Sequence, residues 1–244
     1  MLIGFAGKAG SGKDYAANRL SYLVQGKTLK HYKLADPIKQ FCRLVFDWNE
    51  DHTDGDLKET ASKLGVTPRQ AMQWLGTEWG RKIDPDCWVN HCLRKIYRDM
   101  HCNQVVTVKN SSQRTFKNLR TQVATITDIR FRNEAEALLS WGGYLIFLEG
   151  GGLQGQVANH ASESSVESVK PLSDIIIDNS ARDTQALDRA LQGFLDSVRD
   201  GTLKDNRHAP AVYDVEAGAR SVPKEPTEES EGRDPMWEFG WKSW

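Results

Sequence analysis

The sequence has no long hydrophobic run, few cysteines and no excess of charge of either sign. No apolar stretch approaches the roughly 20 residues that span a bilayer, and the chain opens on a short apolar segment followed by glycine, not on a signal peptide. Its 32 basic and 33 acidic residues leave a formal net charge of −1, which argues against bulk nucleic-acid binding. These absences predict a soluble, cytoplasmic protein with no membrane partner, and a nucleic-acid partner is not expected.

The cysteines are too few and too scattered for a disulfide scaffold or a paired metal site. They stand at Cys42, Cys87, Cys92 and Cys102. We therefore expect reduced, partly buried thiols.

The composition changes near residue 201. Up to that point the chain alternates apolar and polar segments, and its 244 residues with 39% hydrophobic content suffice for one α/β core. From Thr202 onward it is rich in Pro, Glu, Ser, Gly and Arg and lacks apolar periodicity. The sequence thus predicts one domain over 1–201 and a flexible, low-complexity tail over 202–244.

The N-terminal segment carries the strongest pattern. Six mostly apolar residues, Met1–Ala6, predict a buried strand, and Tyr15–Val24 has apolar residues at helical spacing. Between them lies Gly7-Lys-Ala-Gly-Ser-Gly-Lys13. Glycines permit the backbone angles with which N–H groups surround phosphate oxygens at a helix N-terminus, and Lys13 adds a charge that reaches the β and γ phosphates. Asp14 occupies the place of the usual magnesium-binding Ser or Thr, so either its carboxylate joins the metal shell or the metal is held elsewhere.

A second pattern follows the helix-start signal Thr67-Pro68. In an α-helix, Arg69, Gln73, Gly76 and Thr77 would share one polar face, whereas Met72, Leu75 and Trp79 would form an apolar stripe. A glycine inside a helix costs about 1 kcal/mol relative to alanine and often marks a close approach to the backbone. The next helix is predicted to start at Asp84-Pro85 and carries Trp88 in its first turn.

A third pattern combines a strand with a charged continuation. Val123–Thr127 predicts a strand that is followed by Asp128, Arg130 and Glu134, the last at the start of a helix over about 131–141. In open parallel sheets ligands bind at the carboxyl ends of strands, so Asp128 and Arg130 are expected beside the phosphate loop, although they could merely cap the helix.

The alternation of elements predicts the fold class. Further strands are expected at 28–34, 144–148 and 174–178, and a last helix covers about 183–198. A helix is expected to start at Ala35-Asp36-Pro37, because Asp36 is a good N-cap and Pro37 is tolerated at the first helical position. A polar loop is expected over 49–56. Strands alternating with helices after an N-terminal phosphate loop indicate a three-layer α/β fold with a mainly parallel sheet flanked by helices, as in P-loop NTPases.

The stretch from Asn103 to Thr127 has no acidic residue. Its basic residues, Lys109, Arg114, Lys117 and Arg120, lie between two strand-like runs, 104–108 and 123–127. We expect these runs to form a hairpin with a basic tip, which is either an exposed loop or a mobile lid over phosphates.

Taken together, these residues resemble the deoxynucleoside monophosphate kinases of tailed bacteriophages, over roughly 1–198. The matching motifs are Gly7-x4-Gly-Lys-Asp14, Arg69-x-x-Met-Gln-x-Leu-Gly-Thr77-Glu with Trp88 after it, Thr127-Asp-x-Arg130 with Glu134, His160-x-Ser-Glu163, and Asp174-x-x-Ile-x-Asn179. Tyr15 departs from the family, which usually has a small hydroxyl residue there. The resemblance implies phosphate transfer from ATP to deoxynucleoside monophosphates, a homodimer and, for a viral protein, the host cytoplasm.

The phosphate-loop pattern, the chemistry of phosphoryl transfer and the resemblance together give the expected site residues. ATP and its phosphates would contact Gly7, Gly10, Ser11, Gly12, Lys13, Asp14 and Tyr15. The acceptor nucleotide would contact Arg69, Gln70, Gln73, Gly76, Thr77, Trp88, Asp128, Arg130 and Glu134. Catalysis would fall to Lys13, Arg69, Asp128 and Arg130, with Mg²⁺ held by Asp14 and Asp128, directly or through water.

Two alternatives stay open at this point. One is a small-metabolite kinase of the dephospho-coenzyme A or shikimate type, against which the Arg69–Thr77 motif with Trp88 favours a nucleobase. The other is a non-catalytic nucleotide-binding or DNA-associated protein whose basic hairpin touches nucleic acid.

Overall fold

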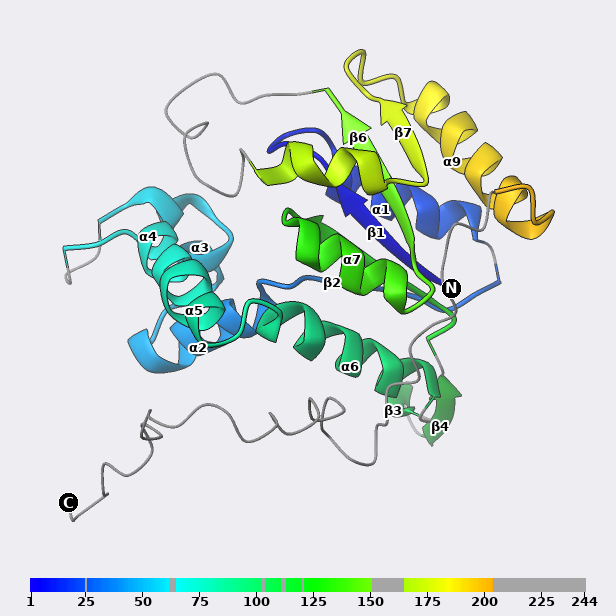
Figure 1. Ribbon diagram of the computed structural model, residues 1–244. Coiled ribbons are helices and arrows are strands. Elements are labelled where there is room, and N and C mark those ends of the chain that lie inside the picture. Colours follow the sequence, from blue (N-terminus) through cyan, green and yellow to red (C-terminus); the bar gives the residue numbers. More distant parts are fainter. Residues whose placement is uncertain are drawn as a thin grey trace, which may run out of the picture. The chain divides into compact units, whose positions relative to one another are not determined.

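The computed structural model describes residues 1–24, 26–61, 65–101, 104–110, 113–119, 121–150 and 165–203 (Figure 1). For the two strands between 104 and 119 it describes the backbone only. Residues 204–244 of the predicted tail, the His160-x-Ser-Glu163 motif and Cys102 lie outside the described residues, so the boundary at residue 201 stays a prediction. Cys42, Cys87 and Cys92 are free thiols, as expected, and two of them, Cys42 and Cys92, are buried.

A five-stranded parallel sheet forms the centre of the fold, in the order β2-β5-β1-β6-β7. Its strands are β1 (Leu2–Ala6), β2 (Leu29–Tyr32), β5 (Val123–Ile129), β6 (Tyr144–Glu149) and β7 (Ile175–Asp178). The central strand β1 is buried along its whole length, which is why its sequence reads as a continuous apolar run. The predicted mainly parallel sheet is thereby confirmed.

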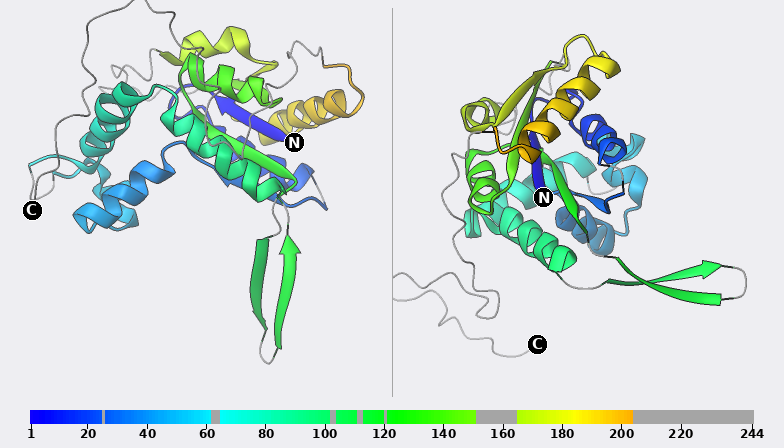
Figure 2. Two further views of the ribbon diagram at one scale, coloured as in Figure 1. Left: turned by 60° about the horizontal axis from the view of Figure 1, so that its bottom comes forward. Right: turned by 90° about the vertical axis from the view of Figure 1, so that its right-hand side faces the viewer.

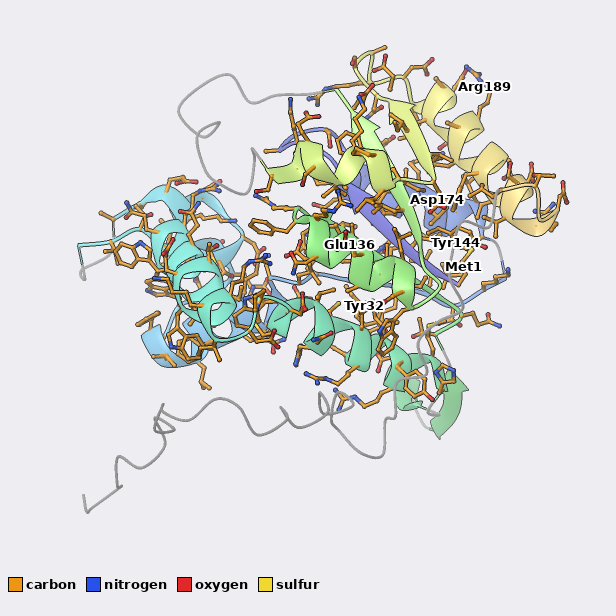
Figure 3. The ribbon with its side chains drawn as sticks, in the orientation of Figure 1. Met1, Tyr32, Glu136, Tyr144, Asp174 and Arg189 are labelled. Carbon is orange, nitrogen blue, oxygen red and sulfur yellow. The ribbon has the colours of Figure 1, made fainter. Side chains whose placement is uncertain are left out.

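Helices cover both faces of the sheet (Figure 2), and side chains of the helices and strands meet between the layers in two hydrophobic cores (Figure 3). Ile3 and Phe5 of β1 belong to the core shared with α1 (Lys13–Leu23) and α9 (Thr184–Arg199), whereas Leu2 and Ala6 belong to the opposite core. That second core is built with α6 (Cys87–His101), α7 (Arg132–Ser140) and the 3₁₀ helix η4 (Val166–Leu172). The alternation of side chains along β1 thus produces the three layers.

Short helices between β2 and α6 form a separate group beside the sheet (Figure 1). They are α2 (Asp36–Phe46), α3 (Glu50–Thr53), η1 (Asp56–Glu59), α4 (Pro68–Gln73), η2 (Trp74–Gly80) and α5 (Arg81–Ile83). The predicted polar loop over 49–56 is wrong in part, because Asn49 and His52 form a capping box that starts α3. The predicted start of α4 is confirmed, with Thr67 as its N-cap.

The N-cap predicted for α2 is wrong. Ala35 holds that position and Asp36 is already helical. Asp128 of β5 instead accepts hydrogen bonds from the backbone N–H groups of Leu34 and Ala35. These two residues precede the first turn of α2, so Asp128 positions the start of the helix without capping it.

The predicted α-helical stripe after Gln73 is also wrong in part. From Trp74 to Gly80 the chain forms a π-helix, whose wider turns change the spacing of the side chains. Trp79, which was expected to face a core, is 57% exposed. The next helix, α6, begins at Cys87, where the side chain of Asp84 accepts a hydrogen bond from the Asp86 N–H.

The predicted hairpin has a different second strand. β3 (Gln104–Asn110) pairs antiparallel with β4 (Gln113–Leu119), and Val123–Thr127 belongs to β5 in the central sheet. Figure 2 shows the β3–β4 hairpin as a two-stranded element apart from the main sheet. Val123 cannot serve both sheets, because β5 is hydrogen-bonded on both sides, to β1 and to β2.

The helices and strands predicted between 131 and 198 are confirmed apart from small shifts at their ends. Gly142, with φ of 71°, follows α7, and β6 starts at Tyr144. Asp183 caps α9 by accepting a hydrogen bond from the Gln185 N–H. No helix in the described part of the chain is both long and apolar enough to cross a lipid bilayer.

Candidate functional site

The phosphate loop connects β1 to α1 with its glycines in left-handed conformations. Gly7 has φ of 141° and Gly12 has φ of 94°, values that other residues rarely adopt. Space is limiting as well, because a Cβ on Gly7 would lie 2.4 Å from the carbonyl oxygen of Leu148. The Lys13 ammonium donates to the carbonyl oxygens of Gly7 and Lys8, both at 2.7 Å. The loop therefore folds around its own lysine, which can exchange these carbonyls for phosphate oxygens.

Asn179 and Arg182, from the segment between β7 and α9, hold the outer side of this loop. The Asn179 Nδ2 donates to the Ser11 carbonyl at 2.9 Å, and Arg182 donates to the Gly10 carbonyl at 3.3 Å. A Cβ on Gly12 would lie 2.6 Å from the same Asn179 nitrogen. In the sequence Asn179 is marked only as the last residue of a motif, although its position directly after a predicted strand also indicates a functional role.

Asp14 lies in the first turn of α1 and is ionised. Thr127 donates to its Oδ1 at 2.6 Å, and Lys33 forms an ion pair with the same oxygen at 3.1 Å. Burial opposes the charge, but these two partners and Lys13 outweigh it and hold the pKa of Asp14 below its usual value. Its side chain is still 64% exposed, so its oxygens are accessible to a cation or to water.

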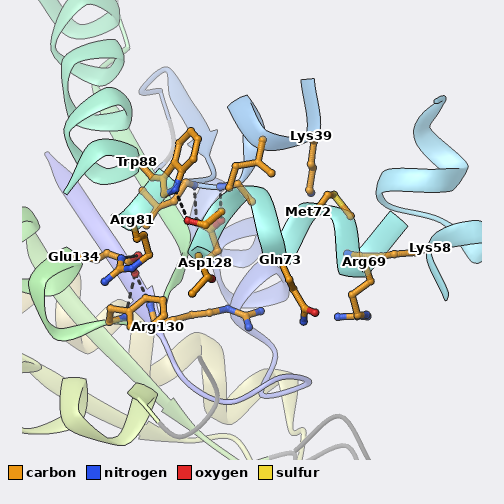
Figure 4. Close-up of a pocket in the computed structure, with 16 residues that line it drawn as sticks. Lys39, Lys58, Arg69, Met72, Gln73, Arg81, Trp88, Asp128, Arg130 and Glu134 are labelled. Carbon is orange, nitrogen blue, oxygen red and sulfur yellow. Dashed lines mark hydrogen bonds and ion pairs between the residues drawn. The ribbon is translucent and has the colours of Figure 1, made fainter. Parts of the chain in front are cut away.

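A pocket of about 200 Å³ opens at the carboxyl end of β5 (Figure 4). It contains most of the predicted acceptor residues, namely Arg69, Gln73, Gly76, Thr77, Trp88, Asp128, Arg130 and Glu134. The remaining lining residues are Leu34, Ala35, Ile38, Lys39, Lys58, Met72, Arg81 and Phe131. The structure thus brings together residues from the second and third of the sequence patterns, which are about 50 residues apart in the chain.

Asp128 ties the pocket to the phosphate loop. Its preceding residue, Thr127, contacts Asp14, whereas its own oxygens accept the N–H groups of Leu34 and Ala35 at 2.8 and 3.0 Å. Burial raises the pKa of Asp128 in spite of these hydrogen bonds. Within the described residues no group of three or more His, Cys, Asp or Glu side chains is placed to hold a metal ion. That Asp14 and Asp128 hold Mg²⁺, directly or through water, stays a prediction.

Glu134 accepts the hydrogen bonds that fix Arg81, Arg130 and Phe131 in another wall of the pocket. Its Oε2 accepts the N–H groups of Arg130 and Phe131 at 2.9 and 3.0 Å, and its Oε1 accepts from Arg81 at 3.1 Å. Burial, only partly offset by these partners, raises the pKa of Glu134 to about 7. The Arg81 guanidinium also stacks on the Phe131 ring, 3.8 Å from its centroid. Arg81 had no motif to mark it in the sequence.

Trp88 is a rigid wall of the pocket. Its indole N–H donates to the Gly76 carbonyl at 2.9 Å, which fastens α6 to the π-helix. A Cβ on Gly80 would lie 2.4 Å from the Trp88 ring, and one on Gly76 would lie 2.9 Å from the Ile38 side chain. Gly76 also lines the pocket, but the close approach expected at this glycine is made by side chains of the protein itself, those of Ile38 and Trp88.

Two of the predicted residues point elsewhere. The Oε1 of Gln70 accepts the Thr67 N–H at 2.9 Å and completes the cap of α4, so Gln70 does not line the pocket. The Tyr15 hydroxyl lies 3.0 Å from the Thr184 hydroxyl at the start of α9. The side chain of Tyr15 is therefore directed to α9, consistent with its departure from the family pattern.

No protein-family model matches the chain. A protein of Acanthamoeba polyphaga mimivirus, "Putative deoxynucleotide monophosphate kinase", is 32% identical over 190 residues, which cover 73% of this chain and 89% of that protein. Among solved structures, the shikimate kinase of Acinetobacter baumannii in complex with shikimate is 13% identical with a TM-score of 0.37, over 83% of this chain and 95% of that one. The shikimate kinase of Bacteroides thetaiotaomicron is 11% identical with a TM-score of 0.35, over 82% and 98%.

Proposed function

This chain belongs to the family of deoxynucleotide monophosphate kinases, and on that premise we propose that it transfers the terminal phosphoryl group of ATP to a deoxynucleoside monophosphate. The products are ADP and a deoxynucleoside diphosphate. The nucleophile is an oxygen of the acceptor's own phosphate, so the protein needs no strong general base.

One observation carries the proposal. A pocket lined by arginine side chains and by the amide of Gln73 opens where β5 ends. The consecutive residues Thr127 and Asp128 connect this pocket to Asp14 at the phosphate loop. Two anionic substrates held in adjoining sites, in line with one another, are what phosphoryl transfer requires.

The donor is held by the phosphate loop. The N–H groups at the start of α1 and the Lys13 ammonium surround the β and γ phosphates, with Asn179 and Arg182 supporting the loop from outside. Asp14 is the residue best suited to hold Mg²⁺ or its waters, because it is ionised and exposed and because Mg²⁺ typically uses one or two carboxylates together with substrate phosphates. When bound, the ion neutralises charge on the phosphates.

The acceptor occupies the pocket. Arg69 and Arg130 supply positive charge for the acceptor phosphate and the moving phosphoryl group, and Gln73, one turn after Arg69, presents an amide to the base. Trp88 and Gly76 shape the wall against which the base packs. Asp128 acts mainly by fixing the backbone of Leu34 and Ala35, the two residues that precede α2.

Several finer features are proposals on family grounds. We propose a relationship to the enzymes of tailed bacteriophages, a homodimer, Mg²⁺-ATP as donor, and activity in the cytoplasm of the host cell without a nucleic-acid partner. The viral relative supports the kinase assignment.

The test is a measurement of ADP release with each common deoxynucleoside monophosphate, with shikimate, and with DNA, using Lys13→Ala as the inactive control. We expect turnover with the monophosphates only and a loss of at least a hundredfold in Lys13→Ala, because the lysine contacts charge that develops in the transition state. Turnover with none of the monophosphates, or full activity of a folded Lys13→Ala protein, would refute the assignment.

A further inference from the structure

Three cations from three different elements line the pocket together. Lys39 comes from α2, Lys58 from η1 and Arg69 from α4. Figure 4 shows Lys58 and Arg69 at one end of the pocket, with Trp88 and Glu134 at the other. Charges of one sign gathered at one end of a cavity attract a ligand group of the opposite sign.

The three cations differ in their partners. Lys39 forms an ion pair with Asp54, and Arg69 forms one with Glu59. Lys58 has neither a hydrogen bond nor an ion pair with any group in the described ranges 1–24, 26–61, 65–101, 121–150 and 165–203. The three N–H donors of the Lys58 ammonium group are therefore available to a ligand in the pocket that this residue lines.

The surroundings of Lys58 disfavour its charge. Burial is the largest cause, and repulsion by Arg69 and Lys39 adds to it, while Asp54 and Glu59 offset only part of the effect. Together they hold the pKa of Lys58 below its usual value. A dianionic ligand between Lys58 and Arg69 would remove this repulsion.

We propose that Lys58 binds the phosphate of the acceptor nucleotide together with Arg69. The inference rests on the proposed function, since the ligand is the acceptor of that reaction. Lys58 then makes the pocket selective for a phosphorylated acceptor, and it holds the attacking oxygen for transfer. No motif marks Lys58 in the sequence, because its neighbours Lys39 and Arg69 are brought to it only by the packing of α2, η1 and α4.

The test compares Lys58→Met, which keeps the aliphatic stem and removes the charge, with Lys58→Arg, which keeps the charge. Lys82→Met is the matched control, because the Lys82 side chain is 75% exposed and pairs with Glu78 outside the pocket. We expect Lys58→Met to raise the KM of every deoxynucleoside monophosphate by about tenfold, as for loss of one charged hydrogen bond, with the KM of ATP unchanged. Lys58→Arg should recover most of the affinity, and Lys82→Met should match the wild type.

Two further measurements separate a phosphate contact from a structural effect. If both cations hold one phosphate, the double variant Lys58→Met/Arg69→Ala should lose less affinity than the product of the single losses. Calorimetry of dTMP binding at alkaline pH, in buffers of different ionisation enthalpy, should show proton uptake by the wild type. The uptake should be absent in Lys58→Met, because the bound phosphate restores the pKa of Lys58.

The outcomes are distinct. A wild-type acceptor KM in Lys58→Met, or an equal rise of the ATP and acceptor KM values, would overturn the role of Lys58. If Lys58→Met does not fold, Lys58→Gln decides by the same criterion. Failure of the proposed function would show differently, as the absence of monophosphate turnover and binding in the wild-type protein itself.

Discussion

The hydrogen bond between Asn179 and the phosphate loop should set the affinity for ATP. The Asn179 amide donates to the Ser11 carbonyl at 2.9 Å. In a planar peptide the carbonyl and the following N–H point in opposite directions, so fixing the Ser11 oxygen outward directs the Gly12 N–H toward the phosphates. A Cβ on Gly12 would lie only 2.6 Å from the Asn179 nitrogen, so the Asn179 side chain packs directly against the loop.

The expected magnitude follows from this geometry. Asn179→Ala removes one neutral hydrogen bond and leaves a carbonyl without its donor, a loss of about 1 kcal/mol or roughly fivefold in the Kd of ATP. Asn179→Asp has the same shape but places a carboxylate oxygen opposite the Ser11 carbonyl, and the added repulsion should bring the loss to about 2 kcal/mol, or roughly thirtyfold.

The assay is direct binding of ATP and ADP by calorimetry, with the KM of the acceptor and the melting temperature measured on the same samples. Asn18→Asp is the matched control, because it makes the same chemical change on the exposed face of α1. We expect weaker ATP binding, an unchanged acceptor KM and a nearly unchanged melting temperature in both Asn179 variants. Wild-type ATP affinity in Asn179→Asp would refute the reasoning, as would a parallel loss of ATP and acceptor binding.

Two further predictions concern the pocket. Gln73→Ala should change the ranking of the four common deoxynucleoside monophosphates by about tenfold in kcat/KM, because an amide reads the base, whereas Arg69→Ala should weaken all four alike because it reads the shared phosphate; equal losses for all four in Gln73→Ala would mean that the base is read elsewhere. Because burial raises the pKa of Glu134 from 4.5 to about 7, the folded state binds more protons than the unfolded state between these values, so stability falls as pH rises through that range. This dependence amounts to at most roughly 3 kcal/mol in the free energy of unfolding, and Glu134→Gln should remove it. Denaturant titrations between pH 4.5 and pH 7.5 measure the effect, and an unchanged pH profile in Glu134→Gln would contradict the prediction.

The sequence determined the parts of this protein that depend on neighbouring residues. The glycines of the phosphate loop were recognisable because Gly7 and Gly12 need backbone angles that other residues avoid. The start of α4 was recognisable because Thr67 and Gln70 are three residues apart, as a capping box requires. Half of the residues that line the pocket could be listed as well, because they follow strand ends and helix starts in motifs that match a known family.

Only the tertiary structure decided which distant segments meet. Val105 and Val123 belong to equally strand-like runs, and nothing local shows that the first pairs with β4 and the second with β1 and β2. Asn179 reaches Ser11 across 168 positions of sequence, and Lys58 has neighbours from two other helices. Dihedral preferences and capping act over a few residues, so they can be predicted from the sequence. Strand partners and the charges that share a pocket are set by long-range packing, which local sequence patterns do not encode.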